Sequence, residues 1–331
     1  MRCPRLNELP TSPPDKRGWP WTEESEALPP TTADGKEWPR ITIVTPSFNQ
    51  GQFLEETIRS VLLQGYPNLE YFVLDGGSKD NSVEIIERYS PWLTYWVSEP
   101  DSGQSEAINR GLKLACGLFA TWINSDDLLC KNAFVEHATR VGFGTNVVYV
   151  GYCVYIDEDG TPVSLHRGGV FSFEDLVRVK TVWRSENCRN HIDQPAVLFP
   201  RALFLSTGGL NAKNHFTMDY ELWGEFLLAG ASFHYTEIPF GMFREHHAQK
   251  THDMLLQTQS LVETAANLTK RADYFSEKTK CEILAELDAY HLAFRKAYWR
   301  GTGRLAKIGL PPRIVNPIRS LRRRFQKTIS N

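Results

Sequence analysis

Hydrophobic and polar residues alternate along residues 40–124 in a pattern that predicts an α/β fold. Short runs rich in β-branched and aromatic residues, typical of buried strands, are each closed by polar turn residues. Between these runs, apolar residues recur at three- and four-residue steps, as in amphipathic helices. We expect strands at 41–45, 71–74, 93–97 and 118–123, and helices at 53–64, 80–88 and 105–116. Strands and helices that alternate through short links predict a mostly parallel sheet with helices on both faces.

The pattern is less regular after residue 130. It predicts a hairpin over 147–156 with a turn at 157–160, strands at 194–199 and 232–238, a helix at 220–228, and long helices at about 254–270 and 278–299. We therefore expect a main domain over 40–252 and a helical, basic C-terminal extension over 253–331.

Residues 1–39 differ in composition from the rest of the chain. They contain eight prolines and little hydrophobic periodicity, which is typical of an extended or disordered arm. Trp19, Trp21 and Trp38 indicate that part of this arm lies on the globular body, because indole side chains are seldom left without a contact.

Composition bounds the class of protein. Of the 331 residues, 41% are hydrophobic and 23% charged, which is ordinary for a water-soluble protein. The six cysteines are scattered, without a CxxC pair, and are read as free thiols of a reducing compartment. We find neither a secretory signal nor an apolar run long enough to span a bilayer, and expect a cytoplasmic protein.

Charge is distributed unevenly. Eleven of the 37 basic residues follow Asp288, and no acidic residue does. Within this tail, residues 313–331 interleave arginines with apolar residues at helical spacing, which suggests peripheral attachment to an anionic membrane, at its inner face. A helix packed on the domain or an oligomer contact explains the pattern at least as well. No nucleic-acid partner is expected, because no recognised motif accompanies the charge.

Polar residues follow the first, second and fourth predicted strands. Asn124, Ser125, Asp126 and Asp127 come directly after a buried strand, where two adjacent carboxylates repel each other unless a cation or ligand lies between them. Ligands bind outside the carboxyl ends of strands in such sheets, and Mg²⁺ or Mn²⁺ prefers oxygen ligands. These residues therefore suggest a metal–diphosphate site. The alternative is a turn that caps the next helix.

Asp75, after the second strand, also has two interpretations. Its carboxylate could accept the N3–H of uracil, or it could cap the turn that contains Gly76 and Gly77. The chain has neither a GxGxxG fingerprint after the first strand nor a GxxxxGK[ST] loop, which argues against dinucleotide binding and P-loop phosphate transfer.

Several motifs together resemble glycosyltransferase family 2. They are Thr45-Pro46-Ser47-Phe48-Asn49-Gln50, Asp75-Gly76-Gly77-Ser78-Lys79-Asp80, the stretch 98–111, Asn124-Ser125-Asp126-Asp127, Gln194-Pro195-Ala196, Gly208-Gly209-Leu210, Met218-Asp219-Tyr220-Glu221-Leu222-Trp223 and the stretch 244–251. The resemblance spans about residues 40–252. It implies a GT-A fold with a nucleotide-binding half (40–130) and an acceptor-binding half (131–252). It also implies inverting transfer of a sugar from a nucleotide-diphosphate donor, commonly UDP-linked, to a glycan or lipid-linked acceptor.

The resemblance also implies roles for individual residues. The residues expected to hold the donor are Pro46, Ser47, Asn49 and Asp75 at the nucleoside, with Asp101, Gln104, Asn109, Asn124 and Asp126 along the rest of the pocket. Asp126, Asp127 and His246 are expected to hold Mn²⁺ or Mg²⁺. Asp219 matches the catalytic base. Tyr220 and Trp223 beside it are expected to stack on an acceptor sugar.

The chain departs from the family pattern at two positions. Asn124 stands where many relatives carry aspartate, so the metal motif has one negative charge fewer. Met218 stands where a glutamate often precedes the base, which leaves Asp219 without a like-charged neighbour. Two other functions stay open. A catalytically silent module that binds sugar nucleotides or glycans is one, and a nucleotidyltransferase, whose usual Gly-rich basic signature we do not find, is the other.

Overall fold

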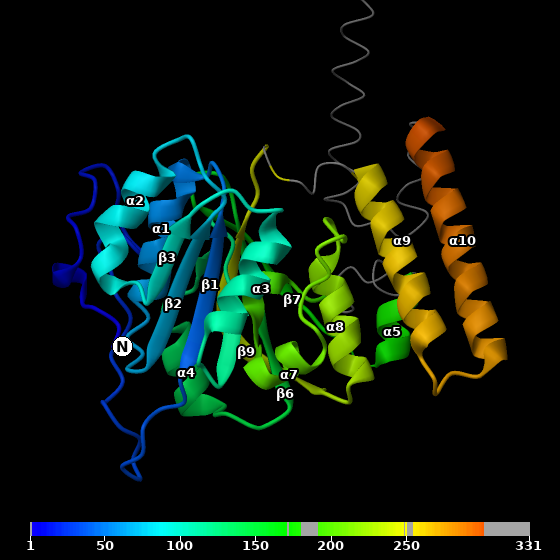
Figure 1. The fold of residues 1–331 in the computed structure, drawn as a ribbon, viewed down its shortest axis with the longest axis horizontal. Coiled ribbons are helices and arrows are strands. Elements are labelled where there is room, and N and C mark those ends of the chain that lie inside the picture. Colours follow the sequence, from blue (N-terminus) through cyan, green and yellow to red (C-terminus); the bar gives the residue numbers. More distant parts are fainter. Residues whose placement is uncertain (1, 171, 180–190, 248, 250–253, 301–331) are drawn as a thin grey trace, which may run out of the picture. The chain divides into compact units, whose positions relative to one another are not determined.

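The computed structural model describes residues 2–170, 172–179, 191–247, 249 and 254–300 (Figure 1). They divide into two compact units. The first is drawn from 1–166, 193–213 and 229–246, and the second from 167–192, 214–228 and 247–331. The second unit thus takes residues from both sides of position 252, and the predicted domain boundaries stay predictions.

A nine-stranded mixed sheet forms the centre of the first unit. Its strands are β1 (Ile41–Ser47), β2 (Leu69–Asp75), β3 (Tyr95–Ser98), β4 (Phe119–Trp122), β5 (Leu128–Leu129), β6 (Val147–Ile156), β7 (Pro162–Arg167), β8 (Val197–Pro200) and β9 (Ser232–Arg244). The order is β3-β2-β1-β4-β8-β6-β9-β5, with β7 paired to β6. The first four strands are mutually parallel, as their β-branched runs predict. Antiparallel β8 then joins them to the second half of the sheet.

Helices cover both faces of the parallel strands (Figure 1). They are α1 (Gly51–Leu62), α2 (Ser82–Tyr89) and α3 (Gln104–Leu114), with α4 (Ala133–Arg140) and α7 (Arg201–Ser206) further along the chain. Successive side chains of a strand point to opposite faces. In β1, Ile43 joins the core that contains Leu54 and Ile58 of α1, whereas Val44 lies against α3. The approach of α3 is so close that a Cβ on Gly111 would meet Val44 at 2.8 Å.

Two strand predictions need correction. The predicted strand at 194–199 begins only at Val197, because Gln194–Ala196 forms a 3₁₀ turn around Pro195, which has no N–H to donate to a ladder. The predicted strand at 232–238 continues to Arg244. Its parallel pairing with β6 shifts register near Tyr152, and these irregularities accommodate Pro239 and Gly241 within the strand.

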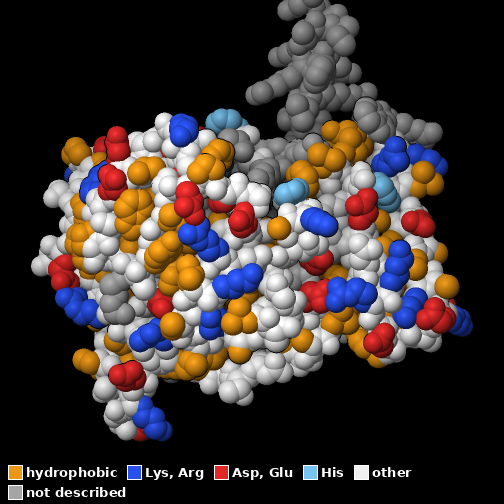
Figure 2. Space-filling view, in the orientation of Figure 1, with side chains coloured by type: hydrophobic (Ala, Val, Ile, Leu, Met, Phe, Trp, Pro, Cys, Tyr) orange, Lys and Arg blue, Asp and Glu red, His pale blue; other side chains and the backbone are white. Residues whose placement is uncertain are grey.

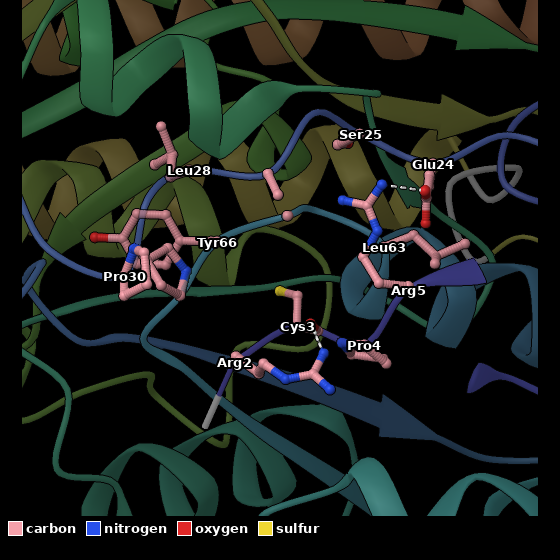
Figure 3. Close-up of a pocket in the computed structure, with 13 residues that line it drawn as sticks. Arg2, Cys3, Pro4, Arg5, Glu24, Ser25, Leu28, Pro30, Leu63 and Tyr66 are labelled. Carbon is pink, nitrogen blue, oxygen red and sulfur yellow. Dashed lines mark hydrogen bonds and ion pairs between the residues drawn. The ribbon is translucent and has the colours of Figure 1, made fainter. Parts of the chain in front are cut away.

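The N-terminal arm lies on the first unit, as its tryptophans predict. Trp19 Nε1 donates to the carbonyl of Leu129 at 2.9 Å, and the buried Arg59 donates to the carbonyl of Pro20 at 3.1 Å. The arm and the segment after α1 enclose a cavity of about 230 Å³ that Tyr66 lines (Figure 3). Arg2 and Arg5, the two cationic side chains among the described residues that line it, are both paired with glutamates.

His137 on α4 is a buried histidine of the first unit. Its ring packs edge-on against Tyr149 and Phe143, with centroids 4.5 and 5.1 Å away. Its Nε2 atom has no hydrogen-bond partner among the described residues. Burial, with a smaller contribution from the charge of nearby His234, lowers its pKa to about 4. The native ring is therefore neutral at pH 7.

We expect this histidine to make folding stability depend on pH. Below about pH 6.5 the unfolded chain binds a proton at this side chain, whereas the native chain binds it only near pH 4. Its contribution to the free energy of unfolding is therefore complete above pH 6.5 and falls by about 1.4 kcal/mol per pH unit as pH drops toward 4. Urea unfolding of the wild type and of His137→Gln between pH 4 and 7 measures the difference, and parallel curves would contradict the assignment.

The second unit is helical. It contains α5 (Phe173–Val177), α8 (Met218–Leu228), α9 (Met254–Arg271) and α10 (Glu277–Arg300). Helix α9 packs against the other three. The long helices agree with the pattern predicted at 254–270 and 278–299. No helix within the described ranges is long and apolar enough to cross a bilayer.

The basic segment 313–331 lies outside the described residues, so the membrane hypothesis stays a prediction. On the face of the first unit that Figure 2 presents, acidic and basic side chains are interspersed. The described part of that face shows no continuous patch of one sign.

Candidate functional site

The topology brings three of the predicted polar strand ends to one place. The chain leaves β1 toward β2 on one side, and β4 returns to pair with β1 on the other side. The carboxyl ends of β1 and β4 therefore flank a topological switch point, where sheets of this kind bind ligands. Ser47 is in register with Asp75, and Asp75 is in register with Ser98. The carboxyl ends of β1, β2 and β3 thus lie along a single edge of the sheet.

Asp75 holds the loop that follows β2. Its buried carboxylate accepts hydrogen bonds from the amides of Gly77 and Ser78, at 3.1 and 2.8 Å, and from the hydroxyls of Ser78 and Ser98. A carboxylate accepts about four hydrogen bonds, so these contacts occupy the positions that the predicted uracil contact would need. The turn-capping interpretation is therefore the one that this conformation displays.

The end of β1 offers an unpaired polar atom and an exposed ring. Ser47 Oγ is buried without a hydrogen-bond partner in the described part of the chain. The predicted contact Asn49 instead braces the β2 loop, since its amide oxygen accepts from Lys79 N at 2.8 Å. Pro46 is buried in β1.

Phe48 was missed by the motif reasoning. Its side chain is 61% exposed, and a Cβ on Gly76 would come within 3.3 Å of its ring. The same Cβ would lie 3.2 Å from Asp101, so the ring and this carboxylate border one surface. A solvent-exposed aromatic residue in a strand-end loop is the signal that could have identified it.

Three donor-pocket residues are predicted near α3. For two of them, Asp101 and Gln104, a role in donor binding stays a prediction. Asp101 is exposed and accepts a hydrogen bond from Gly103 N at 2.8 Å. Gln104 donates to Asn124 Oδ1, and so joins α3 to the end of β4. For Asn109 the prediction needs correction, because both ends of its amide bond to the backbone of Leu210, each at 2.8 Å. Asn109 therefore anchors a loop.

Asp126 and His246 come together at the end of β4. His246 Nε2 lies 3.0 Å from Asp126 Oδ2, although 120 residues separate them in sequence. The imidazole ring also packs on Phe53 of α1, with centroids 4.8 Å apart. Asn124 completes this turn by donating to Asp127 Oδ2 at 3.1 Å.

Asp127 faces the protein interior, which corrects its prediction as a metal ligand. It is 1% exposed, and its Oδ1 accepts from the backbone N–H of Arg244 at 3.0 Å. Burial raises the pKa of Asp127 well above its usual range, and the neighbouring charge of Asp126 raises it further. Asp127 thus fastens the loop to β9.

The donor set here fits a divalent cation only in part. Among the described residues no group of three His, Cys, Asp or Glu side chains converges as a metal cage would require. Asp126 and His246 supply one carboxylate and one imidazole. Mg²⁺ and Mn²⁺ are commonly held through one or two protein ligands together with substrate phosphates. This pair therefore fits a cation whose remaining ligands would be oxygens of a substrate diphosphate.

Gln194 is a second residue that the motif reasoning left without a role. Its Nε2 donates to the carbonyl of Trp122, the last residue of β4, at 2.6 Å. Its Oε1 is buried and has no hydrogen-bond partner within the described ranges. Gln194 thus adds an unused acceptor near the switch point.

The predicted base and acceptor residues lie in the second unit. Asp219 is half-buried in the first turn of α8, where it accepts from Tyr220 N at 2.8 Å. The predicted stacking by Tyr220 and Trp223 needs correction. Trp223 is 1% exposed, and the buried Tyr220 donates its hydroxyl to the carbonyl of Leu176 at 2.6 Å. Both rings form part of the helical core, so neither presents a face to a sugar.

Comparisons with known proteins find similar sequences and similar folds. Residues 42–198 match the sequence profile described as Glycosyl transferase family 2. The uncharacterized glycosyltransferase RT0329 of Rickettsia typhi is 28% identical over 225 residues, which cover 67% of this chain and 69% of that protein.

Solved structures share the fold. TarS 1–349 of S. aureus, in complex with UDP-GlcNAc, aligns with a TM-score of 0.56 at 16% identity, over 80% of this chain and 75% of that one. The mannosyltransferase PcManGT of Pyrobaculum calidifontis, in complex with GDP-Man and Mn²⁺, aligns with a TM-score of 0.54 at 19% identity, over 94% and 85%. The match covers 44% of a longer TarS chain. At these identities the likeness concerns the fold, and it confirms the predicted GT-A architecture.

Proposed function

Because the chain belongs to glycosyltransferase family 2, we propose that it transfers a sugar from a nucleotide-diphosphate donor with inversion at the anomeric carbon. The family makes it a glycosyltransferase, and the donor, the metal and the stereochemistry are the proposal. The acceptor that we propose is a glycan or a lipid-linked saccharide.

One observation carries the donor site. Asp126 and His246, from distant parts of the chain, meet 3.0 Å apart beside the switch point of the sheet. A nucleotide laid across that crevice would bring its diphosphate to these two side chains. Ser47 Oγ and Gln194 Oε1, both buried without a described partner, offer further polar contacts there.

The proposed cation is Mn²⁺ or Mg²⁺. Asp126 and His246 would hold it, and it would stabilise the negative charge that develops on the leaving diphosphate. Asp127 and Asn124 keep the Asp126 turn in shape through their hydrogen bonds. PcManGT, whose structure contains GDP-Man and Mn²⁺, supports the proposal by its similar fold.

The proposed base is Asp219. Displacement with inversion needs a single base that takes the proton of the attacking hydroxyl on the face opposite the leaving group. The Asp219 carboxylate lies in the first turn of α8, where the positive end of the helix dipole favours the charged form. Asn214, which accepts from Thr217 N at 3.0 Å, fixes the start of this helix.

The nucleobase is the open part of the proposal. Uracil is the base that the family resemblance favours, but the carboxylate of Asp75 is already committed to its own loop. TarS and PcManGT have been solved with UDP-GlcNAc and GDP-Man, respectively. Both donors are therefore the natural first substrates to test.

Turnover tests the proposal. The purified full chain is incubated with UDP-GlcNAc or GDP-mannose and Mn²⁺, with and without saccharide acceptors, and the released nucleoside diphosphate is measured. We expect release from one donor, and NMR of the product should show the inverted anomer. Nucleotide binding without release from any donor would favour the catalytically silent module. In a parallel reaction that supplies a nucleoside triphosphate and a sugar 1-phosphate instead, release of inorganic pyrophosphate would indicate a nucleotidyltransferase.

Phe48 gives a prediction about the nucleobase. When an aromatic residue that stacks on a nucleobase is replaced by alanine, the binding free energy weakens by about 1–3 kcal/mol. We expect Phe48→Ala to weaken nucleotide binding by about 5- to 150-fold by calorimetry. Leu118→Ala, which removes an equally exposed apolar side chain before β4, serves as the control. Equal affinities in both variants would remove Phe48 from the site.

A further inference from the structure

Arg244, the last residue of β9, is a fully buried arginine beside the proposed metal site. Its backbone N–H donates to Asp127 Oδ1 at 3.0 Å, and its Nε donates to the carbonyl of Asp126 at 2.9 Å. One residue thus holds both members of the aspartate pair. His246 follows two positions later, so the same strand end also sets the position of the imidazole.

The two terminal nitrogens of the guanidinium are also hydrogen-bonded. One terminal nitrogen donates to the carbonyl of Glu158 at 2.9 Å, and the other to Glu56 Oε2 at 2.8 Å. The group also lies 4.9 Å from the centroid of Phe53, the ring on which His246 packs. A buried charge is tolerated only when it is paired and its donors are satisfied, and Glu56 supplies the opposite charge.

Glu56 connects this arrangement to the N-terminal arm. Its second oxygen, Oε1, accepts from the indole N–H of Trp21 at 3.3 Å. Trp21 is itself held in place, because Arg59 donates to its carbonyl at 3.2 Å and lies 5.4 Å from its ring. A continuous set of contacts therefore runs from Trp21 through Glu56 and Arg244 to Asp126.

Helix α1 adds an independent attachment for the same loop. The hydroxyl of Thr57, next to Glu56, lies within hydrogen-bonding distance of two loop carbonyls, those of Ser125 at 2.9 Å and Asp127 at 2.8 Å. The loop is thus held from α1 and from β9. The Arg244 contacts reach the arm through Glu56 and the indole of Trp21.

We propose that Glu56 and Arg244 are positioning residues that hold Asp126 and His246 at the separation a divalent cation requires, with Trp21 of the arm as the outer member of the set. This inference rests on the proposed metal-assisted function. Residues that orient the ligands of a metal commonly change its affinity by about 10- to 100-fold when they are mutated. Trp21 lies outside the family match at 42–198, so the arm becomes part of the working enzyme.

The test is Arg244→Lys in the full chain. Lysine keeps the positive charge, but it has no planar fork that could reach Glu56, Glu158 and the Asp126 carbonyl together. UDP and, in a parallel series, GDP are titrated by calorimetry at several Mn²⁺ concentrations. We expect the Mn²⁺ concentration for half-maximal nucleotide affinity to rise by about 10- to 100-fold. Excess Mn²⁺ should then restore turnover.

The matched control is Arg201→Lys. Arg201 also donates to backbone carbonyls of the first unit, those of Leu112 and Lys113. Within the described part of the chain its guanidinium makes no hydrogen bond to the loop that carries Asp126 and Asp127. We expect its Mn²⁺ requirement to equal that of the wild type. A folded Arg244→Lys protein with the wild-type Mn²⁺ requirement would overturn the inference and leave the proposed function standing.

A second variant covers the case in which Arg244→Lys does not fold. Trp21→Phe keeps an aromatic ring but removes the indole N–H that donates to Glu56 Oε1. We expect the Mn²⁺ requirement to rise by about 2- to 5-fold, since residues along such a network shift coupling modestly. An unchanged requirement in this variant would remove the arm from the set. A wild type that binds neither nucleotide with Mn²⁺ would contradict the proposed function itself.

Discussion

Asp219→Asn is expected to lower kcat by about 10²- to 10⁴-fold, because a general base contributes about that much to proton transfer. Asparagine has nearly the same shape, so nucleotide affinity and the fold should be preserved. The thermal midpoint should move little, since a charge in a helix's first turn contributes only about 0.3–1 kcal/mol. The measurement is steady-state release of nucleoside diphosphate at saturating donor.

The control for this variant lies on the same helix. Glu225→Gln removes a carboxylate from α8 that pairs with Arg271 at the surface of the second unit. Its kcat should match that of the wild type. If Asp219→Asn retained full turnover, another residue would have to take the proton of the acceptor, and the assignment of the base would fail.

Asp126→Asn is expected to have the second large effect. The substitution removes the carboxylate that lies 3.0 Å from His246 and that we propose as the charged ligand of the cation. The cation would lose its charged ligand. Turnover should then fall by about 100-fold or more, because removing a single group that stabilises charge developing in a transition state commonly costs that much. Nucleotide binding should become independent of Mn²⁺, which calorimetry with and without the metal detects.

Asp159→Asn provides the comparison for this second variant. Asp159 lies in the turn between β6 and β7, and the change removes one negative charge without altering the loop after β4. The same Mn²⁺ dependence as in the wild type is expected. If Asp126→Asn kept that dependence as well, the cation would have to bind elsewhere.

The parallel half of the sheet could be predicted from the sequence for a physical reason. Strands buried on both faces, such as β1 and β2, appear as continuous β-branched and aromatic runs, and the helices between them show a clear period. The polar residues at their carboxyl ends then have to share one edge of the sheet. That reasoning placed Ser47, Asp75 and Asp126 in one crevice.

Side-chain direction could not be predicted in the same way. Adjacent residues of a loop can face opposite sides, and so Asp126 faces His246 while Asp127 faces the interior. Asn109 and Trp223 lie on helices whose polar or aromatic positions suit both a pocket and a core. Only the tertiary contacts of these residues, with Leu210 and the helical core, decide between the two.

Long-range contacts were equally out of reach. The run through Arg244 contains Pro239 and Gly241, which normally end a strand, and the bulged pairing with β6 overrides them. The link from Trp21 to Glu56 joins residues 35 positions apart in segments of different composition. No local sequence pattern predicts such a contact.

Calorimetric binding of UDP and GDP to the full chain, with and without Mn²⁺, is the decisive test of the proposed donor site. We expect one of the two nucleotides to bind, and to bind tightly only when the metal is present. Saturation at about 100 times Kd should also stabilise the fold by about 2.7 kcal/mol, which a thermal shift would register. Failure of both nucleotides to bind, with or without Mn²⁺, would contradict the donor site formed at β1 and β4.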